Sequence, residues 1–343
     1  MAIDKESDLM TDTDPGIGHV EVPGTDLRVS RLVLGTMTFG AQVGRDDASR
    51  MLDIAADAGV TMLDTANGYA GGASESLLGD LLAARSGHRF LVATKVGMPN
   101  PDAGDLPPLA PEAIRRCLDA SLRRLRLDHV DVYYLHQPDR ATPMAETLAE
   151  LGRLVEAGKV RHVGVSNYAA WQIAELRRIA ADAGLPAPVV SQPLYNLLSR
   201  RIEDEYQEFT RTAGITDIVY NPLGGGLLTG KHVFEETPAQ GRFGTESGLG
   251  EMYRRRYWNR ELFDAVTELG AVAADSGQTL PELAFRWLLG NPDVGAVLLG
   301  SSKVEHLASN IGAARGGPLP DDVRAACDRV WERLRGVAPA YNR

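Results

Sequence analysis

Eight short apolar runs, separated by longer amphipathic segments, constrain the fold of this chain more than any other feature. The runs are rich in Val, Ile, Leu and Tyr and mostly lack polar alternation, which is typical of strands buried on both faces. They span 31–35, 61–66, 90–95, 130–136, 161–167, 188–195, 217–223 and 294–300. The segments between them carry apolar residues at three-to-four spacing, which predicts helices. These segments are 46–59, 75–85, 111–126, 145–159, 169–184 and 280–290.

Eight strand–helix units over this length predict a (β/α)₈ barrel, the TIM-barrel fold, in one domain over 17–343. The acidic, polar residues 1–16 are predicted to form a flexible tail. A doubly wound open sheet is the alternative, but it usually carries GxGxxG after its first strand, and GTMTFG at 35–40 lacks that spacing.

Three further elements are expected around the barrel. A hairpin is predicted from 19–22 and 27–30, because PGTD between them is a turn sequence. Two additional helices are expected at 259–277 and 320–336. The polar, Gly- and Arg-rich connection 223–258 is long enough to predict a functional loop, such as a lid, on the carboxyl-terminal face.

Composition excludes several classes of protein. Lys and Arg number 36 against 46 Asp and Glu, a net charge of −10, which disfavours sequence-independent nucleic-acid binding. Two cysteines cannot build a disulfide framework, and with the unpatterned histidines they predict no metal site. The cysteine usage favours a reducing compartment, so we expect a cytoplasmic protein. No apolar run is long enough to cross a bilayer, and no membrane association is expected.

Polar residues that close the predicted strands indicate the chemistry. Asp64, Lys95 and His136 end three neighbouring strands, and Tyr69 follows Asp64 in a short turn. Catalytic groups of (β/α)₈ barrels lie at these strand ends. A lysine beside a tyrosine is expected to lower the phenol pKa, and such a phenol can give a proton to a carbonyl oxygen as hydride arrives at carbon. Each residue alone could equally be a satisfied polar group of the core; together they predict a site for carbonyl reduction.

The strings that carry these residues, and several later ones, resemble the aldo-keto reductase superfamily. They are LGTMTFG 34–40, LDTANGY 63–69, TK 94–95, YYLH 133–136, GVSNY 164–168, SQPLYN 191–196, YNPLGGGLLTGK 220–231 and LLGSS 298–302. A second set is similar to the aflatoxin aldehyde and succinic semialdehyde reductase branch. This set comprises HQPDRATPMAETL 136–148, SNYAAWQIAE 166–175, GRFG 241–244, EMYRRRYW 251–258 and AYNR 340–343.

The resemblance implies an NADPH-dependent reductase of aldehydes or reactive ketones, with Tyr69 as general acid and Asp64, Lys95 and His136 as its partners. Ser166, Asn167 and Gln192 would hold the nicotinamide carboxamide, Tyr220 would stack on the ring, and 224–231 would follow the pyrophosphate. Ser301, Ser302 and Asn310 would surround the adenosine end. The remaining expected cofactor contacts are Gly35, Thr36, Met37, Asp64, Asn221, Pro222, Leu223, Gly225, Lys231 and Gly300.

Substrate, partner and cofactor preferences follow from the same resemblance. Arg256 and Arg343 match arginines that bind a substrate carboxylate, which favours anionic carbonyl substrates. Many members carry a basic residue where Ser302 stands, but this branch uses serine there, so NADPH is still expected. The branch often forms homodimers.

Two alternatives stay open: a keto-sugar or nucleotide-sugar reductase that uses the arginines against phosphate, and a cofactor-binding regulatory subunit such as the potassium-channel β subunits.

Two local patterns have other interpretations. GGLLTGK at 225–231 fits the opening of a P-loop, but His232 follows where Ser or Thr would bind magnesium, so the glycines are assigned to a cofactor pyrophosphate. Trp171 and Trp287 lie at apolar helical spacing and are expected in the core.

Overall fold

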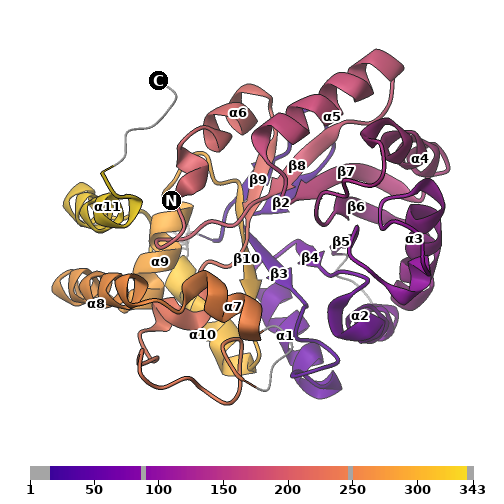
Figure 1. Cartoon of the computed structure of the whole chain (residues 1–343). Coiled ribbons are helices and arrows are strands. Elements are labelled where there is room, and N and C mark those ends of the chain that lie inside the picture. Colours follow the sequence, from indigo (N-terminus) through magenta and orange to yellow (C-terminus); the bar gives the residue numbers. More distant parts are fainter. Residues whose placement is uncertain (1–15, 86–89, 246–249, 338–343) are drawn as a thin grey trace, which may run out of the picture.

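The computed structural model describes residues 16–85, 90–245 and 250–337. Eight parallel strands close into a barrel in the order β10-β3-β4-β5-β6-β7-β8-β9, as predicted (Figure 1). Their bounds are β3 Leu32–Gly35, β4 Met62–Asp64, β5 Leu91–Val96, β6 Val130–Leu135, β7 Val160–Ser166, β8 Pro188–Gln192, β9 Thr216–Val219 and β10 Ala296–Gly300. Each strand pairs in parallel with both neighbours, so all their carboxyl ends open on one face.

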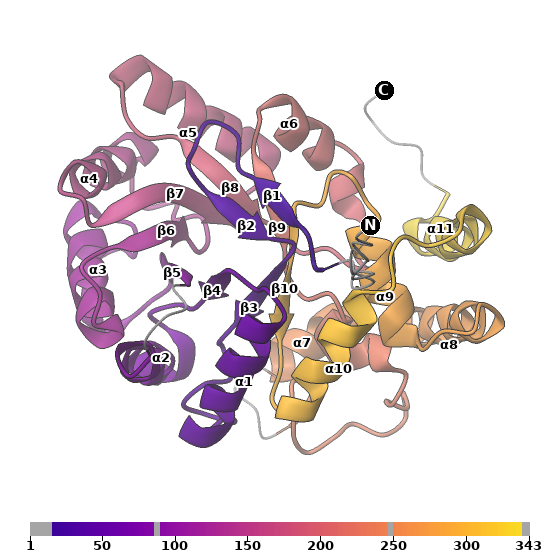
Figure 2. The ribbon, with the colours of Figure 1, turned by 180° about the vertical axis from the view of Figure 1, so that it is seen from behind.

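The predicted hairpin is present and belongs to the opposite end of the barrel. Strands β1 (His19–Glu21) and β2 (Arg28–Ser30) pair antiparallel, and they lie across the barrel strands in the view from behind (Figure 2). Val22, Leu27 and Val29 join the same apolar cluster as the barrel interior. The hairpin therefore covers the closed end, and the chemistry is left to the other face.

Apolar side chains fill both sides of the strands. One cluster fills the barrel interior and includes Val33, Met62, Val132 and Ile218. A larger cluster lies between the strands and the surrounding helices. Burial on both faces explains why the strands lack polar alternation in sequence.

Helices surround the barrel. They are α1 Arg45–Asp57, α2 Ala73–Ala83, α3 Pro111–Leu125, α4 Met144–Glu156, α5 Ala170–Ala183, α6 Tyr206–Thr212, α7 Gly250–Tyr257, α8 Arg260–Asp275, α9 Leu280–Leu289, α10 Val304–Ala314 and α11 Asp321–Arg335. All six predicted inter-strand helices and both additional helices, α8 and α11, are present within a few residues of the expected bounds. Helices α6 and α10 complete the two units for which no helix was predicted. Helix α6 has only seven residues, which is too short for a clear apolar repeat.

The connection 223–258 contains the 3₁₀ segment η4 (Gly224–Thr229) and helix α7. One expectation was wrong. Trp171 is 65% exposed rather than core, whereas Trp287 is buried as expected. Trp171 lies in the first turn of α5 between the buried residues Ala170 and Gln172, and its side chain faces solvent. Within the described part of the chain, no helix combines the length and apolar character needed to span a membrane.

Candidate active site

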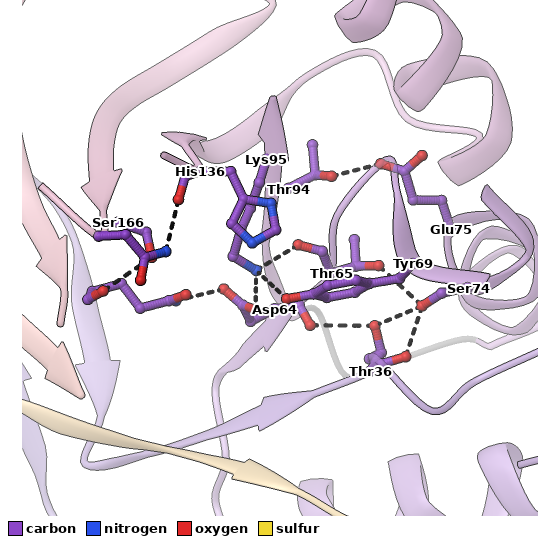
Figure 3. Close-up of polar contacts among 12 residues, drawn as sticks. Thr36, Asp64, Thr65, Tyr69, Ser74, Glu75, Thr94, Lys95, His136 and Ser166 are labelled. Carbon is purple, nitrogen blue, oxygen red and sulfur yellow. Dashed lines mark hydrogen bonds and ion pairs between the residues drawn. The ribbon is translucent and has the colours of Figure 1, made fainter. Parts of the chain in front are cut away.

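Three neighbouring strands bring the predicted reactive side chains together. Asp64 is the last residue of β4, Lys95 lies one residue before the end of β5, and His136 directly follows β6. Tyr69 begins the 3₁₀ segment η1 (Tyr69–Gly72), which turns back over these strand ends. Figure 3 shows the four side chains converging at the open face of the barrel.

The ammonium of Lys95 is the centre of this group. Its Nζ donates to Asp64 Oδ1, to the Thr65 carbonyl at 2.8 Å and to the Tyr69 hydroxyl at 3.3 Å. The second oxygen of Asp64 accepts from Gln192 Nε2 at 2.9 Å. Lys95 and Asp64 are both almost fully buried. A buried ion pair is tolerated only when its remaining donors and acceptors are satisfied, and these contacts meet that requirement.

The pKa of Tyr69 is raised, not lowered as the sequence suggested. Burial of the phenol raises its pKa and the Asp64 carboxylate adds to that effect, and together they outweigh the lowering by Lys95. Burial also acts to lower the pKa of Lys95, but Asp64 and Tyr69 raise it above its ordinary value. The phenol therefore keeps its proton and the lysine its charge. Since Lys95 donates to the phenolic oxygen, the phenol hydrogen is left to point elsewhere.

His136 faces Tyr69 edge-on, with 5.9 Å between the ring centroids. Burial and the nearby Lys95 ammonium lower the pKa of His136 to about 3. The imidazole is therefore neutral at physiological pH, and it can donate or accept one hydrogen bond without bringing a second positive charge to the site. The His136 carbonyl accepts from Asn167 Nδ2 at 2.9 Å, which connects the ends of β6 and β7.

Amide and hydroxyl groups from β7, β8 and β9 lie beside this group. The Ser166 hydroxyl donates to the Gln192 carbonyl at 3.0 Å and accepts from Asn167 Nδ2 at 3.1 Å. The Tyr220 hydroxyl donates to Asn167 Oδ1 at 2.7 Å. Asn167 has a φ of 61°, a left-handed conformation that asparagine tolerates better than most residues. The structure thus brings together Ser166, Asn167 and Gln192, and their role toward a carboxamide stays a prediction.

Some expected cofactor residues use their side chains within the protein. The Thr36 hydroxyl is fully buried and contacts Ser74 and the Asp64 carbonyl, and the Thr36 backbone amide and carbonyl are hydrogen-bonded within the protein as well. Asn221 is buried as well: Oδ1 accepts from the Gly225 amide at 2.7 Å and Nδ2 donates to Tyr257 at 2.8 Å. Asn221 therefore shapes the glycine loop instead of reaching the open face. Gly35 ends β3, Met37 is half-buried beside Thr36, and Pro222 and Leu223 lead into the loop.

The glycine loop and the end of β10 surround a cationic side chain that the sequence analysis missed. Gly224, Gly225 and Gly226 all have positive φ, and a Cβ on Gly225 would meet Tyr253 at 2.8 Å. A Cβ on Gly300 would meet the Arg242 guanidinium at 3.0 Å, so Arg242 reaches from the β9 connection to the end of β10. Within the described residues, Arg242 forms no ion pair with a carboxylate. The GRFG string at 241–244, which contains Arg242, is the sequence feature that could have pointed to this residue.

The residues expected at the adenosine end of the cofactor come after β10 in the chain. Ser301 is buried and its hydroxyl donates to the Lys303 carbonyl at 2.7 Å, whereas Ser302 is exposed. Asn310 lies half-buried on α10, and Lys231 is exposed after η4. Glycines that bring the backbone close, together with a guanidinium that has no carboxylate partner among the described residues, fit the phosphates of a dinucleotide.

Arg256 is the described member of the two predicted substrate arginines, and Arg343 lies outside the described residues. The Arg256 guanidinium affects the pKa of Tyr220. Burial raises the pKa of this phenol above its ordinary value, and the positive charge of Arg256 only partly opposes that rise. Both residues line a groove of about 660 Å³, together with Asn167, Leu198, Leu262 and Trp331. No carboxylate among the described residues forms an ion pair with Arg256, so its charge is available to an anion.

Comparison with known proteins agrees with this geometry. The Aldo/keto reductase family model matches residues 31–332. The chain belongs to the aldo/keto reductase family. This reductase is 36% identical over 325 residues to human aflatoxin B1 aldehyde reductase member 2, covering 91% of this chain and 89% of the relative. It is also 34% identical to a probable voltage-gated potassium channel subunit beta from rice, covering 85% and 90% of the two chains.

A solved structure of the family supports the same assignment. The reductase superposes on the glycerol dehydrogenase of Gluconobacter oxydans with a TM-score of 0.78 at 29% identity, covering 94% of this chain and 98% of that one. Family membership makes the protein an oxidoreductase that acts on small carbonyl compounds and uses a nicotinamide cofactor.

Proposed function

We propose that this protein is an NADPH-dependent reductase that favours anionic aldehydes or reactive ketones, with Tyr69 as the general acid. The observation that carries the proposal is the 3.3 Å contact between Lys95 Nζ and Tyr69 Oη. Because the ammonium donates to the phenolic oxygen, the Tyr69 proton is directed away from Lys95. A carbonyl oxygen beside Tyr69 would receive that proton.

The other residues would act through charge and orientation. Lys95 would stabilise negative charge that develops on the Tyr69 oxygen during proton transfer, and Asp64 holds the ammonium in place. Neutral His136 would donate a hydrogen bond to the substrate oxygen from the other side. A preorganised set of donors aimed at developing charge is the largest contribution to many such reactions.

The nicotinamide cofactor would supply hydride to the carbonyl carbon when bound. Ser166, Asn167 and Gln192 would hold its carboxamide, and Tyr220 would pack against the ring. The glycines of η4 and Arg242 would contact the pyrophosphate. The close backbone approach at Gly225 and the Arg242 guanidinium, which forms no ion pair with a carboxylate of the described residues, support this placement. Lys303 and Ser302 would lie near a 2′-phosphate, which favours NADPH over NADH.

Substrate preference would come from Arg256. A guanidinium without a carboxylate partner, in a groove of about 660 Å³, suits a carboxylate-bearing carbonyl compound. Succinic semialdehyde and 2-carboxybenzaldehyde have this chemistry. A phosphorylated keto-sugar would use the same arginine, so a substrate panel distinguishes the two.

Binding and turnover together test the proposal. Titration with NADPH and NADH, followed by intrinsic fluorescence, should give the lower Kd for NADPH. Turnover of 2-carboxybenzaldehyde should then consume NADPH, and Tyr69→Phe should lower kcat by about 10²- to 10⁴-fold while leaving the NADPH Kd unchanged. Tyr133→Phe is the matched control, because the hydroxyl of that buried tyrosine donates to the Ile114 carbonyl at 3.4 Å, on the helix side of the barrel wall.

Two outcomes would contradict the proposal. Undiminished turnover by Tyr69→Phe would remove Tyr69 as the acid. Tight NADPH binding without turnover of any charged or neutral carbonyl compound would favour the alternative that similarity to a potassium channel β subunit raises, a cofactor-binding regulatory partner.

A further inference from the structure

The chain immediately after Tyr69 has an unusual backbone. Ala70, Gly71 and Gly72 have φ values of 50°, 63° and 92°, so three consecutive residues are left-handed. Glycine populates this region readily and has the largest conformational freedom of any residue. On the side before Tyr69 the chain is anchored, because the Tyr69 amide donates to the Ala66 carbonyl at 3.1 Å. On the other side, the position of the phenol depends on what fixes the far end of the linker that these three residues form.

The far end of the linker is the first turn of α2, where Ser74 and Glu75 are completely buried. The Ser74 hydroxyl donates to the Thr36 carbonyl at 2.7 Å and contacts the Thr65 hydroxyl at 3.1 Å. Thr36 and Thr65 directly follow β3 and β4 (Figure 3). Ser74 thus connects α2 to two strand ends.

Glu75 connects the same turn to the strand that carries Lys95. Its Oε1 accepts from the Thr94 hydroxyl at 2.5 Å. Thr94 precedes Lys95 in β5, and successive side chains of a strand point to opposite faces. Lys95 therefore faces the open end of the barrel while Thr94 faces α2 (Figure 3). The carboxylate joins the Tyr69 segment to the Lys95 strand through one hydrogen bond.

The second carboxylate oxygen of Glu75 contacts a side chain of α3. Its Oε2 accepts from Arg124 Nε at 2.7 Å, and Arg124 Nη2 in turn donates to Asp102 at 2.8 Å, in the connection after β5. A buried carboxylate is costly even when it is paired, and such groups can be retained because they select one conformation. The conformation selected here places Tyr69 beside Lys95.

We propose that Glu75 is a positioning residue, which sets the distance between the Tyr69 phenol and the Lys95 ammonium from outside the barrel. The inference rests on the proposed function, in which Tyr69 donates the proton. A displaced phenol would lose proton transfer but would leave the cofactor residues of β7 to β10 in place. Glu75 should therefore affect kcat and leave cofactor binding unchanged.

The test compares Glu75→Ala with Glu150→Ala. Glu150 is an equally buried carboxylate, ion-paired with Arg115 and Arg153 on the outer helices, far from the strand ends. We expect Glu75→Ala to lower kcat for 2-carboxybenzaldehyde by about 10- to 100-fold, since small displacements of reacting groups have effects of this size. KM and the NADPH Kd should stay within twofold. Glu75→Gln, which keeps the acceptor for Thr94, should recover most of the lost kcat, whereas Glu150→Ala should keep the wild-type kcat.

Thr94→Val covers the case in which Glu75→Ala does not fold. It removes the hydroxyl donor while keeping the side-chain shape and the pair between Glu75 and Arg124, and it should lower kcat several-fold with unchanged KM. Wild-type kcat in Thr94→Val, or equal losses in Glu75→Ala and Glu150→Ala, would overturn the inference. Tyr69→Phe in the same assay separates the two proposals. If Tyr69→Phe is inactive and the Glu75 variants are normal, only the positioning role fails; if Tyr69→Phe is active, the proposed function fails first.

Discussion

The Lys95 ammonium lies 3.3 Å from the Tyr69 phenolic oxygen. Burial alone would disfavour a charged lysine at this place, and the two residues are 26 positions apart in the chain. Asp64 makes the arrangement possible, because its carboxylate compensates the buried ammonium from the other side. Asp64 raises the pKa of Lys95 against the lowering effect of burial. Burial and Asp64 together raise the pKa of Tyr69, so the phenol keeps its proton and can act as the donor. The consequences of this arrangement can be measured separately for stability, ionisation and substrate choice.

Removing the lysine should destabilise the fold as well as abolish activity. Lys95→Met leaves Asp64 buried without its cation, a loss of about 3–5 kcal/mol in the free energy of unfolding. Urea denaturation measures it. Lys159→Met is the control: its ion pair with Asp119 is partly exposed, and it should cost less than about 1 kcal/mol. Equal losses in the two variants would show that the Lys95 pair is not buried in this way.

His136 should remain neutral throughout the physiological range. Its pKa is lowered to about 3 by burial and by Lys95, against an ordinary value of 6.5. A His with a lowered pKa stabilises the fold above its unfolded pKa, and that stability is lost as pH falls from about 6.5 towards 3. Nitrogen NMR of the imidazole should show one neutral tautomer from pH 8 to pH 5. A titration midpoint near 6.5 would refute the burial argument.

Arg256 should govern the choice between charged and neutral substrates. Arg256→Ala should raise KM for 2-carboxybenzaldehyde by about tenfold or more, since a hydrogen bond to a charged group contributes about 1.5–3 kcal/mol. KM for benzaldehyde should change little. Arg255→Ala is the matched control, because Arg255 is exposed and paired with Glu251. A similar rise for the neutral and the charged aldehyde would exclude a carboxylate role.

Asp217 should give the protein a pH-dependent stability unrelated to catalysis. Burial raises its pKa to about 7, and the Ser191 and Thr210 hydroxyls that donate to it only partly offset that effect. The folded protein then binds a proton that the unfolded chain releases near pH 4. Stability is therefore highest below about pH 4 for this group and is lost as pH rises through 7.

Asp217→Asn should reduce that pH dependence. The wild-type protein should lose about 2–3 kcal/mol from this group between pH 5 and pH 8, and the variant should not. Urea midpoints at the two pH values measure the difference. Asp182→Asn, which alters an exposed carboxylate, should retain the wild-type pH dependence. An unchanged pH dependence in Asp217→Asn would show that Asp217 is ionised when folded.

The closed parallel barrel and the meeting of Asp64, Lys95 and His136 at one of its faces could be predicted from sequence because both depend on local patterns. Strands that are buried on both faces must be apolar throughout, so eight such runs define a closed parallel barrel. Polar residues that end those runs must then meet at one face, so the sequence predicts that Asp64, Lys95 and His136 lie together. Gly59, Gly158 and Gly184 lie just past the ends of α1, α4 and α5, all with the positive φ that glycine favours.

Tertiary structure decided what depends on surroundings that are distant in sequence. The sign of the Tyr69 pKa shift follows from how much burial opposes the Lys95 charge, and burial is a property of the packed structure. The exposure of Trp171, the helix within 223–258 and the reach of Arg242 to Gly300 have the same origin. Glu75 shows it most clearly: no local pattern pairs it with Thr94 and Arg124, because these residues meet only when β5, α2 and α3 have packed together.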